Sequence, residues 1–465
     1  MPTATKETSE PMSSNLDKVL RNPRRRAGIN VKEYVKLVPM LAVMVGVLMP
    51  PEVRINVLDQ NLYAYRVAYL GFTPWLIYTI AKGGLRFKYI DLFILAASSW
   101  MMVSFVALYG IVEGAPSGVA VALDFSIPYL IARTTIRSIN DFRRLLIVLA
   151  PMCMLVAVTL PIEAITQDRF IRDSALAVFG RVTEMPFQIK HDVRWGLLRA
   201  MGPFSHQILA GLFFSGLMPL YWFSGIRGWP RIVGFLSGFA TLFTLSSAAF
   251  LGLLMFLILA AYEFIRRIVV FLTWQIFVFA ASATLLTLHV VSENGIFRLM
   301  LNFTLRPYTG YYRLLIWEYG SKSVAKHPWL GIGFEEWDRL PFMHTSVDTL
   351  WLSVAMKNGL PAALLLGLAA TLILIGCAVS VKRLKGFDRA TILGLTMTLF
   401  IFAVQGFTVS FFGGMLIWYM MLLGIGANFG FLNVRASRPM VVRTRKSSNR
   451  ISLMDGRSDA PDVIP

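Results

Sequence analysis

Charged side chains are scarce in this chain: only 15% of its 465 residues are Asp, Glu, Lys or Arg, whereas 56% are hydrophobic. A soluble domain carries about 25% charged residues, so the shortage argues against an ordinary soluble enzyme. Apolar runs of about 20 residues, long enough to cross a bilayer as a helix, recur along the sequence. Backbone polar groups must be satisfied inside lipid, and the composition therefore predicts an all-α polytopic membrane protein.

Cysteine is nearly absent. Cys153 and Cys377 lie far apart inside apolar runs and have no partner motif, so we interpret both as small packing residues that form neither a disulfide nor a metal site. The longer polar loops also lack a metal-ligand spacing, a nucleophile elbow, a Walker loop and a dinucleotide fingerprint. These absences argue against metalloproteases, lipases, ATP-driven pumps and redox enzymes, and predict that no metal or cofactor is bound.

Acidic residues are outnumbered by basic ones, 26 against 45, which gives a net charge of +19. In a soluble protein this excess would indicate nucleic acid as a partner. Here Lys and Arg collect in short loops between apolar runs, as the positive-inside rule predicts for cytoplasmic loops. The expected partner is therefore the lipid bilayer and not a nucleic acid.

Twelve transmembrane helices place every basic loop and both termini in the cytoplasm. They cover approximately residues 37–50, 62–81, 89–111, 118–134, 145–161, 206–224, 232–247, 249–264, 268–288, 359–380, 390–409 and 411–431. The seventh and eighth could instead form one bent hairpin. Residues 1–36 are expected to be a disordered basic leader without a cleavable signal peptide, 37–431 the membrane domain, and 432–465 a disordered tail.

Two longer loops, about 162–204 and 289–349, fall on the outer side and carry charges of both signs. Arg313 and Trp317 lie four residues apart, so a helix would place them on one face. In the first loop, Arg199 lies just outside the sixth predicted helix, and Arg194 is a weaker candidate. An interfacial Trp with a snorkelling Arg would explain the same pattern, but guanidinium forks also match phosphate oxygens. A lipid-linked diphosphate is the substrate that such a site would suit.

Candidate bases lie in the second loop. His344 and Asp348 are four residues apart, and either could deprotonate a sugar hydroxyl as a general base. If the tenth predicted helix begins early, both side chains lie on one side near its N-terminus. His327 precedes Pro328, where a fold-shaping role is the better interpretation, and His206 lies at the start of the sixth helix.

Three stretches together resemble the O-antigen ligase and polysaccharide polymerase superfamily of bacterial inner-membrane glycosyltransferases. The first is R-x-x-G-x-F-x-H from Arg199 to His206, and the second runs from Arg313 through HPWLGIGF to Phe334. The third is HTSVDTLWLSVAMKNGLP, which contains Gly359. The order and topology of these stretches cover most of the chain from about residue 60 to 430.

The resemblance implies a metal-independent inverting glycosyltransferase. Such enzymes move a glycan from an undecaprenyl-diphosphate donor to a sugar hydroxyl at the periplasmic face, the acceptor being lipid A core in the ligases and a lipid-linked repeat in the polymerases. It implies that Arg199 and Arg313 hold the diphosphate while a His or Asp of the second loop acts on the acceptor. A chain-length regulator is a further expected partner of a polymerase.

The chain departs from the family pattern at two positions. Where the family has His before the last motif, counting back from Gly359 reaches Asp348, with His344 one turn earlier, so the base is Asp348, His344 or the pair. This version looks more like exopolysaccharide polymerases than lipid A-core ligases. Second, the family's T-x-S-R turn reads TLSSAA here, with Ser247 in place of the arginine. Arg194 or Arg306 is expected to supply that contact.

Two other functions fit parts of the pattern. A transporter (flippase) of lipid-linked saccharides suits twelve helices equally well, but transport needs polar or charged residues deep in the membrane. Few are evident in the predicted helices, where Gln405 and Asn428 are uncharged, and no internal repeat is obvious. A non-catalytic membrane scaffold remains the third alternative.

Overall fold

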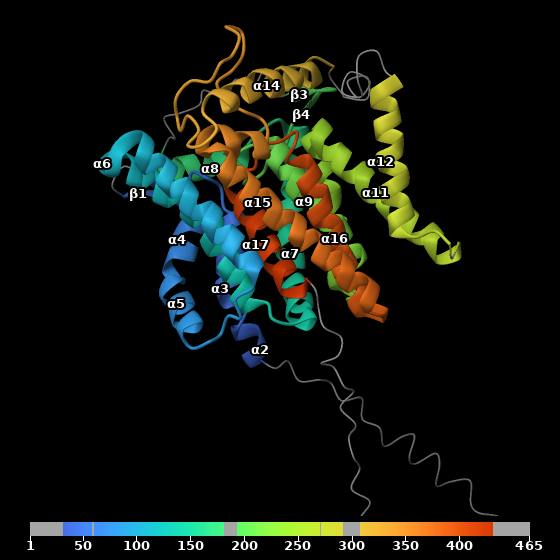
Figure 1. Ribbon diagram of the computed structural model, residues 1–465. Coiled ribbons are helices and arrows are strands. Elements are labelled where there is room, and N and C mark those ends of the chain that lie inside the picture. Colours follow the sequence, from blue (N-terminus) through green and yellow to red (C-terminus); the bar gives the residue numbers. More distant parts are fainter. Residues whose placement is uncertain (1–30, 58–59, 181–192, 270, 292–306, 431–465) are drawn as a thin grey trace, which may run out of the picture. The chain divides into compact units, whose positions relative to one another are not determined.

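The computed structural model describes residues 31–57, 60–180, 193–269, 271–291 and 307–430, which belong to a compact unit that extends to Leu432. Among these residues, five helices are long and apolar enough to cross a membrane. They are α6 (Tyr89–Thr135), α7 (Ile139–Thr166), α11 (Ser247–Ile268), α15 (Leu350–Arg383) and α16 (Gly386–Gln405) (Figure 1). These helices agree with the prediction of an all-α membrane protein.

The shorter helices complete the described unit. They are α2 (Val31–Val35), α3 (Val38–Val47), α4 (Ala64–Gly71), α5 (Thr73–Ala81), α8 (Phe170–Phe179), α9 (Gln207–Trp222), α10 (Trp229–Ser237), the 3₁₀ helix η2 (Gly238–Thr244), α12 (Trp274–Val291), α14 (Pro307–Lys326) and α17 (Gly414–Phe429). Helix α2 falls inside the predicted leader, and its Glu33 forms an ion pair with Arg144 of α7. The rest of the leader and the predicted tail lie outside the described residues.

Two small antiparallel hairpins were not predicted. Strands β1 (Arg54–Val57) and β2 (Gln60–Tyr63) pair with Arg54 opposite Tyr63. Strands β3 (Val193–Arg194) and β4 (Leu197–Leu198) pair across a two-residue loop in which Trp195 and Gly196 both have positive φ. A two-residue hairpin of this kind needs positive φ at both loop positions. Tryptophan is an unusual residue at such a position, so this turn has no recognisable sequence signal.

Helix α6 combines the third and fourth predicted helices. Its backbone leaves the helical region at Gly110, where φ is 77° and ψ is 176°. A Cβ placed on Gly114 would lie 2.2 Å from the carbonyl oxygen of Phe105, so the two halves of α6 fold back against each other. The sequence had placed the turn at residues 113–118, which are helical here. Glycine tolerates the positive φ of the true turn at no steric cost.

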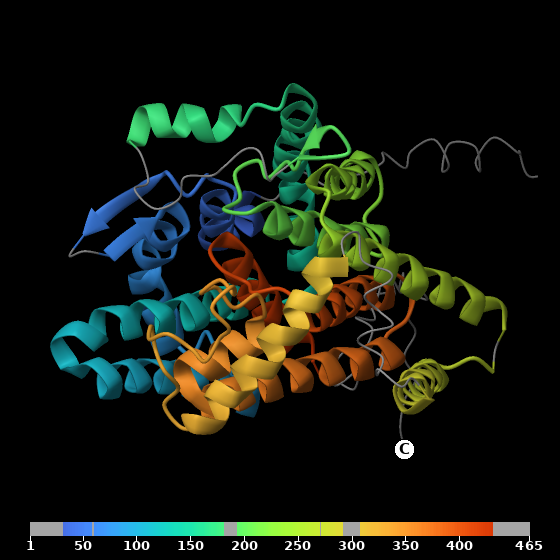
Figure 2. The ribbon, with the colours of Figure 1, turned by 90° about the horizontal axis from the view of Figure 1, so that it is seen from above.

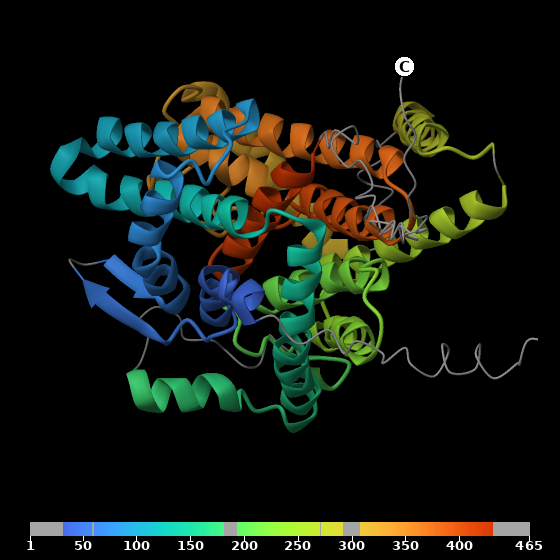
Figure 3. The same ribbon diagram turned by 90° about the horizontal axis from the view of Figure 1, so that it is seen from below.

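Helix α17 lies at the centre of the packing. It contacts α6, α15, α16 and α3 (Figure 1), and its large side chains Trp418 and Tyr419 are fully buried. Helix α7 packs beside α10 on another side of the unit (Figure 3). Helix α14, which is not apolar enough to be a membrane helix, lies across α15 (Figure 2).

Polar contacts fasten α6 to the C-terminal end of α17. The guanidinium of Arg133 donates to both carboxylate oxygens of Asp91 at 2.7 Å, and the hydroxyl of Tyr129 donates to the same carboxylate at 2.6 Å. The ammonium of Lys88 donates to the carbonyl oxygen of Ala427 at 2.6 Å. Since the last carbonyls of a helix favour cations, these groups neutralise one another and have a structural role.

A second ion pair joins α4 to α6. Arg66 of α4 donates to both oxygens of Asp124 of α6, at 3.1 and 2.5 Å, and Tyr69 donates to the same carboxylate at 2.8 Å. Both charged residues lie within segments predicted to cross the membrane, where charges are paired or functional. The prediction that few charges lie deep in these helices is therefore wrong at this pair.

The HPWLGIGF stretch stabilises a break in α15. At Gly359 φ is 81°, and the helix is interrupted there. The carbonyl oxygens of Met356 and Lys357, just before the break, accept hydrogen bonds from the amides of Ile332 and Gly333 at 2.7 and 3.1 Å. On the far side, the amide of Leu360 donates to the carbonyl of Pro328 at 2.8 Å. The stretch therefore satisfies backbone groups that a broken helix leaves unpaired.

Replacing Gly359 with Ala tests this arrangement. The added Cβ would lie 1.8 Å from the carbonyl oxygen of Trp329, on a residue whose φ already disfavours a side chain. We expect the Gly359→Ala protein to be lost from the folded fraction, measured by size-exclusion chromatography of detergent-solubilised protein. Gly367→Ala, in the same helix with nothing within 4 Å of the new Cβ, is the control and should remain folded. Equal recovery of the two variants would contradict this account of the break.

Candidate functional site

One cavity of about 530 Å³ gathers arginines from both predicted outer loops. We call it the arginine cavity. Its polar lining includes Arg194, Arg199, His206, Ser246, Ser247, Tyr312, Arg313, His344, Ser346, Asp348, Thr408 and Ser410. Segments distant in sequence thus meet around one space: the β3–β4 region, the start of α11, helix α14, the loop before α15, and residues 406–413 between α16 and α17.

The β3–β4 hairpin explains how two arginines come to this cavity. Arg194 ends β3 opposite Leu197, and Arg199 follows directly after β4. The tight turn therefore returns the chain so that both guanidiniums enter the same lining. Arg199 is 9% exposed, and Arg194 donates from Nη1 to the carbonyl oxygen of Leu245 at 2.7 Å.

A buried carboxylate holds the segment that follows Arg199. Glu163, near the end of α7, is 2% exposed and accepts hydrogen bonds from the amides of Met201 and Gly202 at 3.3 and 2.7 Å. The amide of Ala200 donates to the carbonyl of Phe243 at 3.0 Å. Glu163 is not among the predicted site residues. The only sequence feature that marks it is its place as a carboxylate at the end of an apolar run.

Removal of the Glu163 carboxylate should destabilise the protein. Glu163→Ala leaves two buried amides without acceptors, and each costs about 1–3 kcal/mol. We expect a clearly lower thermal midpoint for the detergent-solubilised protein. Glu113→Ala removes an exposed carboxylate from α6 and should leave the midpoint nearly unchanged. A Glu163→Ala midpoint equal to that of the control would show that these hydrogen bonds contribute little.

Helix α14 supplies the opposite wall. It begins at Pro307, a residue suited to the first turn, and carries Tyr312 and Arg313 into the cavity. Trp317, one turn later, donates from its indole to the carbonyl of Phe407 at 2.9 Å and stacks on that ring. Trp317 therefore holds the 406–413 loop, whose residues Thr408 to Ser410 and Phe412 also line the cavity. Helix α14 therefore supplies Arg313 to the cavity and, through Trp317, holds the neighbouring loop.

Both candidate bases, His344 and Asp348, line the cavity, although they do not lie on a helix as expected. Helix α15 begins at Leu350, so His344 and Asp348 precede it in irregular chain, and the expected helical relation between them is wrong. The backbone amide of His344 donates to the hydroxyl of Tyr312. The amide of Leu350 donates to the carbonyls of Gly406 and Val409, at 2.8 and 3.0 Å, which fixes the chain just after Asp348.

Burial raises the pKa of the Asp348 carboxyl above its usual value, while the nearby charges of Arg313 and His344 oppose this increase. Burial likewise lowers the pKa of Arg313, against the opposing effect of Asp348. A guanidinium nevertheless stays protonated in proteins. The cavity thus places a carboxylate with increased basicity beside a permanent positive charge, a combination useful for a general base next to an anion.

His206 is a neutral hydrogen-bonding group in this environment. Its Nδ1 accepts from the amide of Ile208 at 3.1 Å and caps α9. Because Nδ1 is occupied as an acceptor, Nε2 carries the proton and can donate to a bound oxygen.

His327 is not brought to the cavity. It lies just after the C-terminal end of α14, where its amide donates to the carbonyl of Ser323 and its own carbonyl accepts from Gly331, both at 3.1 Å. These backbone bonds agree with a fold-shaping role. Arg306, the other residue expected to replace the missing arginine, lies outside the described residues.

The position of Arg194 bears on the arginine missing at Ser247. Both residues line the arginine cavity, and Arg194 contacts Leu245, two residues before Ser247. A guanidinium from β3 therefore lies in the neighbourhood of Ser247. The role of Arg194 in binding remains a prediction.

Positive groups prevail among the described residues that line the arginine cavity, which include three guanidiniums and one carboxylate. An ionised diphosphate diester carries two negative charges, and guanidinium forks match its oxygens. Among the described residues, no group of three His, Cys, Asp or Glu is placed to hold a metal ion.

Comparison of the chain with protein-family models and with curated proteins finds no match.

Proposed function

We propose that this protein is a metal-independent, inverting glycosyltransferase of bacterial inner membranes that transfers a glycan from an undecaprenyl-diphosphate donor to a sugar hydroxyl at the periplasmic face. We favour a polymerase of surface polysaccharide over a lipid A-core ligase. The observation that carries the proposal is the convergence of Arg194, Arg199, Arg313 and Asp348 on one cavity. In this proposal the chain crosses the membrane twelve times with both termini in the cytoplasm.

The donor diphosphate would bind the guanidiniums. Arg199 comes from the first outer loop and Arg313 from the second, so the two can approach the diphosphate from different segments of the chain. Arg194 supplies the third positive charge, and the Nε2–H of His206 is available to a phosphate oxygen. Guanidiniums held before the substrate arrives stabilise charge without reorganisation at the moment of reaction.

The reaction is a single displacement at the anomeric carbon. The acceptor oxygen forms its bond to that carbon as the bond from the carbon to the phosphate oxygen breaks. The acceptor proton passes to the Asp348 carboxylate, and undecaprenyl diphosphate leaves with the electron pair and one additional negative charge. The arginines stabilise that charge, and backside attack inverts the anomeric centre. His344 lines the same cavity and is the alternative base.

Purified protein in lipid nanodiscs provides the test. Incubation with a synthetic undecaprenyl-diphosphate oligosaccharide and no metal or nucleotide sugar should give longer lipid-linked products, detected by mass spectrometry. Absence of elongation with every oligosaccharide from the producing organism would reject the enzyme. Accumulation of the lipid-linked repeat on the cytoplasmic face in a deletion strain would indicate a flippase instead.

A further inference from the structure

A second cavity, of about 340 Å³, lies beside the arginine cavity and contains a lysine. We call it the lysine cavity. Its lining includes Tyr63, Tyr65, Arg66, Phe105, Asp124, Phe334, Ser353, Lys357, Asn358 and Phe411. Its volume falls within the range of about 300–1,000 Å³ that is usual for small-molecule sites.

The two cavities share a wall built from three chain segments. Ser410 and Phe412 line both. Ser205 lines the lysine cavity and its neighbour His206 the arginine cavity; likewise Leu350 lines the first, while Asp348 lies two residues earlier in the second. A molecule seated in the lysine cavity therefore contacts a wall whose other side faces the arginine cavity, which Asp348 lines.

The charge of Lys357 is the unusual feature of the lysine cavity. Arg66 and Asp124 neutralise each other through two hydrogen bonds at 3.1 and 2.5 Å. Lys357 is exposed and lines the cavity, yet within the described ranges its ammonium has no hydrogen bond or ion pair. The backbone of Lys357 is fixed through its carbonyl by Gly333, next to the break at Gly359. The backbone of Lys357 is therefore held in place, and no carboxylate among the described residues pairs with its ammonium.

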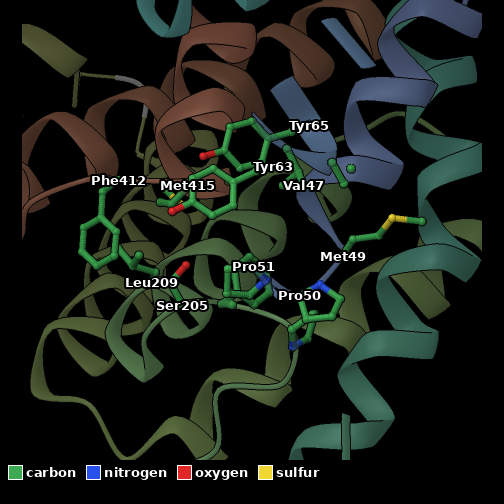
Figure 4. A pocket seen from close by; sticks show the side chains of 15 residues that line it. Val47, Met49, Pro50, Pro51, Tyr63, Tyr65, Ser205, Leu209, Phe412 and Met415 are labelled. Carbon is green, nitrogen blue, oxygen red and sulfur yellow. The ribbon is translucent and has the colours of Figure 1, made fainter. Parts of the chain in front are cut away.

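Aromatic rings and hydroxyls make up much of the remaining lining. Phe334 packs on Phe105 with ring centroids 4.8 Å apart, and Tyr63 stacks on Tyr65 at 5.6 Å. Figure 4 shows Tyr63, Tyr65, Ser205 and Phe412 around a smaller adjoining pocket. Apolar faces with a few fixed polar groups are what an oligosaccharide needs, since each sugar has an apolar face and a rim of hydroxyls.

We infer that the lysine cavity binds the acceptor glycan and that Lys357 pairs with a carboxylate on it, so that the acceptor is an acidic sugar chain. This inference rests on the proposed function, because it takes the arginine cavity as the donor site. One ammonium offsets one carboxylate, whereas the three guanidiniums across the shared wall suit the more highly charged diphosphate. With the donor in the arginine cavity and the acceptor in the lysine cavity, the acceptor hydroxyl would be directed toward Asp348.

The test measures binding of trigalacturonate and of its methyl ester, in which methyl groups neutralise the carboxylates, to the full chain in phosphatidylcholine nanodiscs. We expect the wild type to bind the acid about tenfold or more tightly than the ester, a difference that corresponds to about 1.4 kcal/mol. Lys357→Met should abolish the preference and Lys357→Arg should retain it. Lys322→Met, an exposed lysine of α14 outside both cavities, is the matched control.

Equal binding of acid and ester by the wild type, or a preference that survives Lys357→Met, would overturn the inference. Loss of bound phosphatidylglycerol from Lys357→Met in native mass spectrometry, without an effect on the sugars, would assign the ammonium to a lipid phosphate and overturn it too. Arg313→Met should lose farnesyl diphosphate binding and keep trigalacturonate binding. If the wild type prefers trigalacturonate to its methyl ester but does not bind farnesyl diphosphate, the proposed function is rejected. The inference that Lys357 binds an acidic sugar chain would then be kept.

Discussion

Arg313→Met should reduce polymer formation by about 10²–10³-fold, the loss expected when one preorganised group that stabilises developing charge is removed. Arg313 is the guanidinium that helix α14 supplies to the arginine cavity, and its charge influences the pKa of the Asp348 carboxyl. The leaving diphosphate gains charge during the reaction, so the loss should appear mainly in kcat. Product formation by purified protein, normalised to folded protein, is the measurement.

Two further variants separate charge from general damage to α14. Arg313→Lys keeps the positive charge but not the fork, and should recover part of the activity because a point charge makes fewer bonds to phosphate oxygens. Lys322→Met removes an exposed cation of the same helix, where the ammonium bonds Glu318 at 3.0 Å, and should have wild-type activity. Wild-type activity in Arg313→Met would remove the main support for the proposed donor site.

Asp348→Asn should reduce the rate by about 10²–10⁴-fold, the usual contribution of a general base. The amide preserves size and cannot take the acceptor proton. His344→Gln should cost much less, because the proposed base is Asp348 and His344 is an exposed residue of the cavity lining. Asp338→Asn is the matched control: this carboxylate of the same loop is 2.8 Å from the ammonium of Lys326 and outside the cavity lining. A larger loss in His344→Gln than in Asp348→Asn would transfer the base to the histidine.

The dependence of the reaction rate on pH should also identify Asp348 as the base. The base must be deprotonated, so the rate falls as the pH decreases through the pKa of Asp348. Burial raises that pKa, and the loss should therefore begin at a higher pH than an ordinary aspartate with a pKa of about 3.9 would give. Asp348→Asn should remove this acidic limb from its residual rate. A wild-type rate independent of pH down to the usual aspartate range would contradict the assignment.

The sequence predicts an all-α membrane protein and indicates residues that line one cavity, because both signals are local. Long apolar runs identify membrane helices, and an arginine close to an aromatic outside such a run is conspicuous. Arg199, Arg313, His344 and Asp348 were all singled out, and all line one cavity. The roles assigned to them remain predictions.

Features that depend on distant contacts could not be predicted. Glu163 acts on amides of residues 201 and 202, and the break at Gly359 is held by residues 328–333, so neither is recognisable from its own neighbourhood. The Arg66–Asp124 pair joins α4 to α6 across 58 residues. The turn at Gly110 was placed a few residues late because EGAPSG has the composition of a turn, yet it packs as helix against Phe105. Tertiary packing prevailed over local preference there.

Binding of farnesyl diphosphate, an analogue of the leaving group, to the purified protein tests the central claim most directly. Isothermal titration should show that the wild type binds the diphosphate at least tenfold more tightly than farnesyl monophosphate, and that the double variant Arg199→Met/Arg313→Met loses this preference while Lys322→Met retains it. Equal affinity of the double variant and the wild type for the diphosphate would contradict the account.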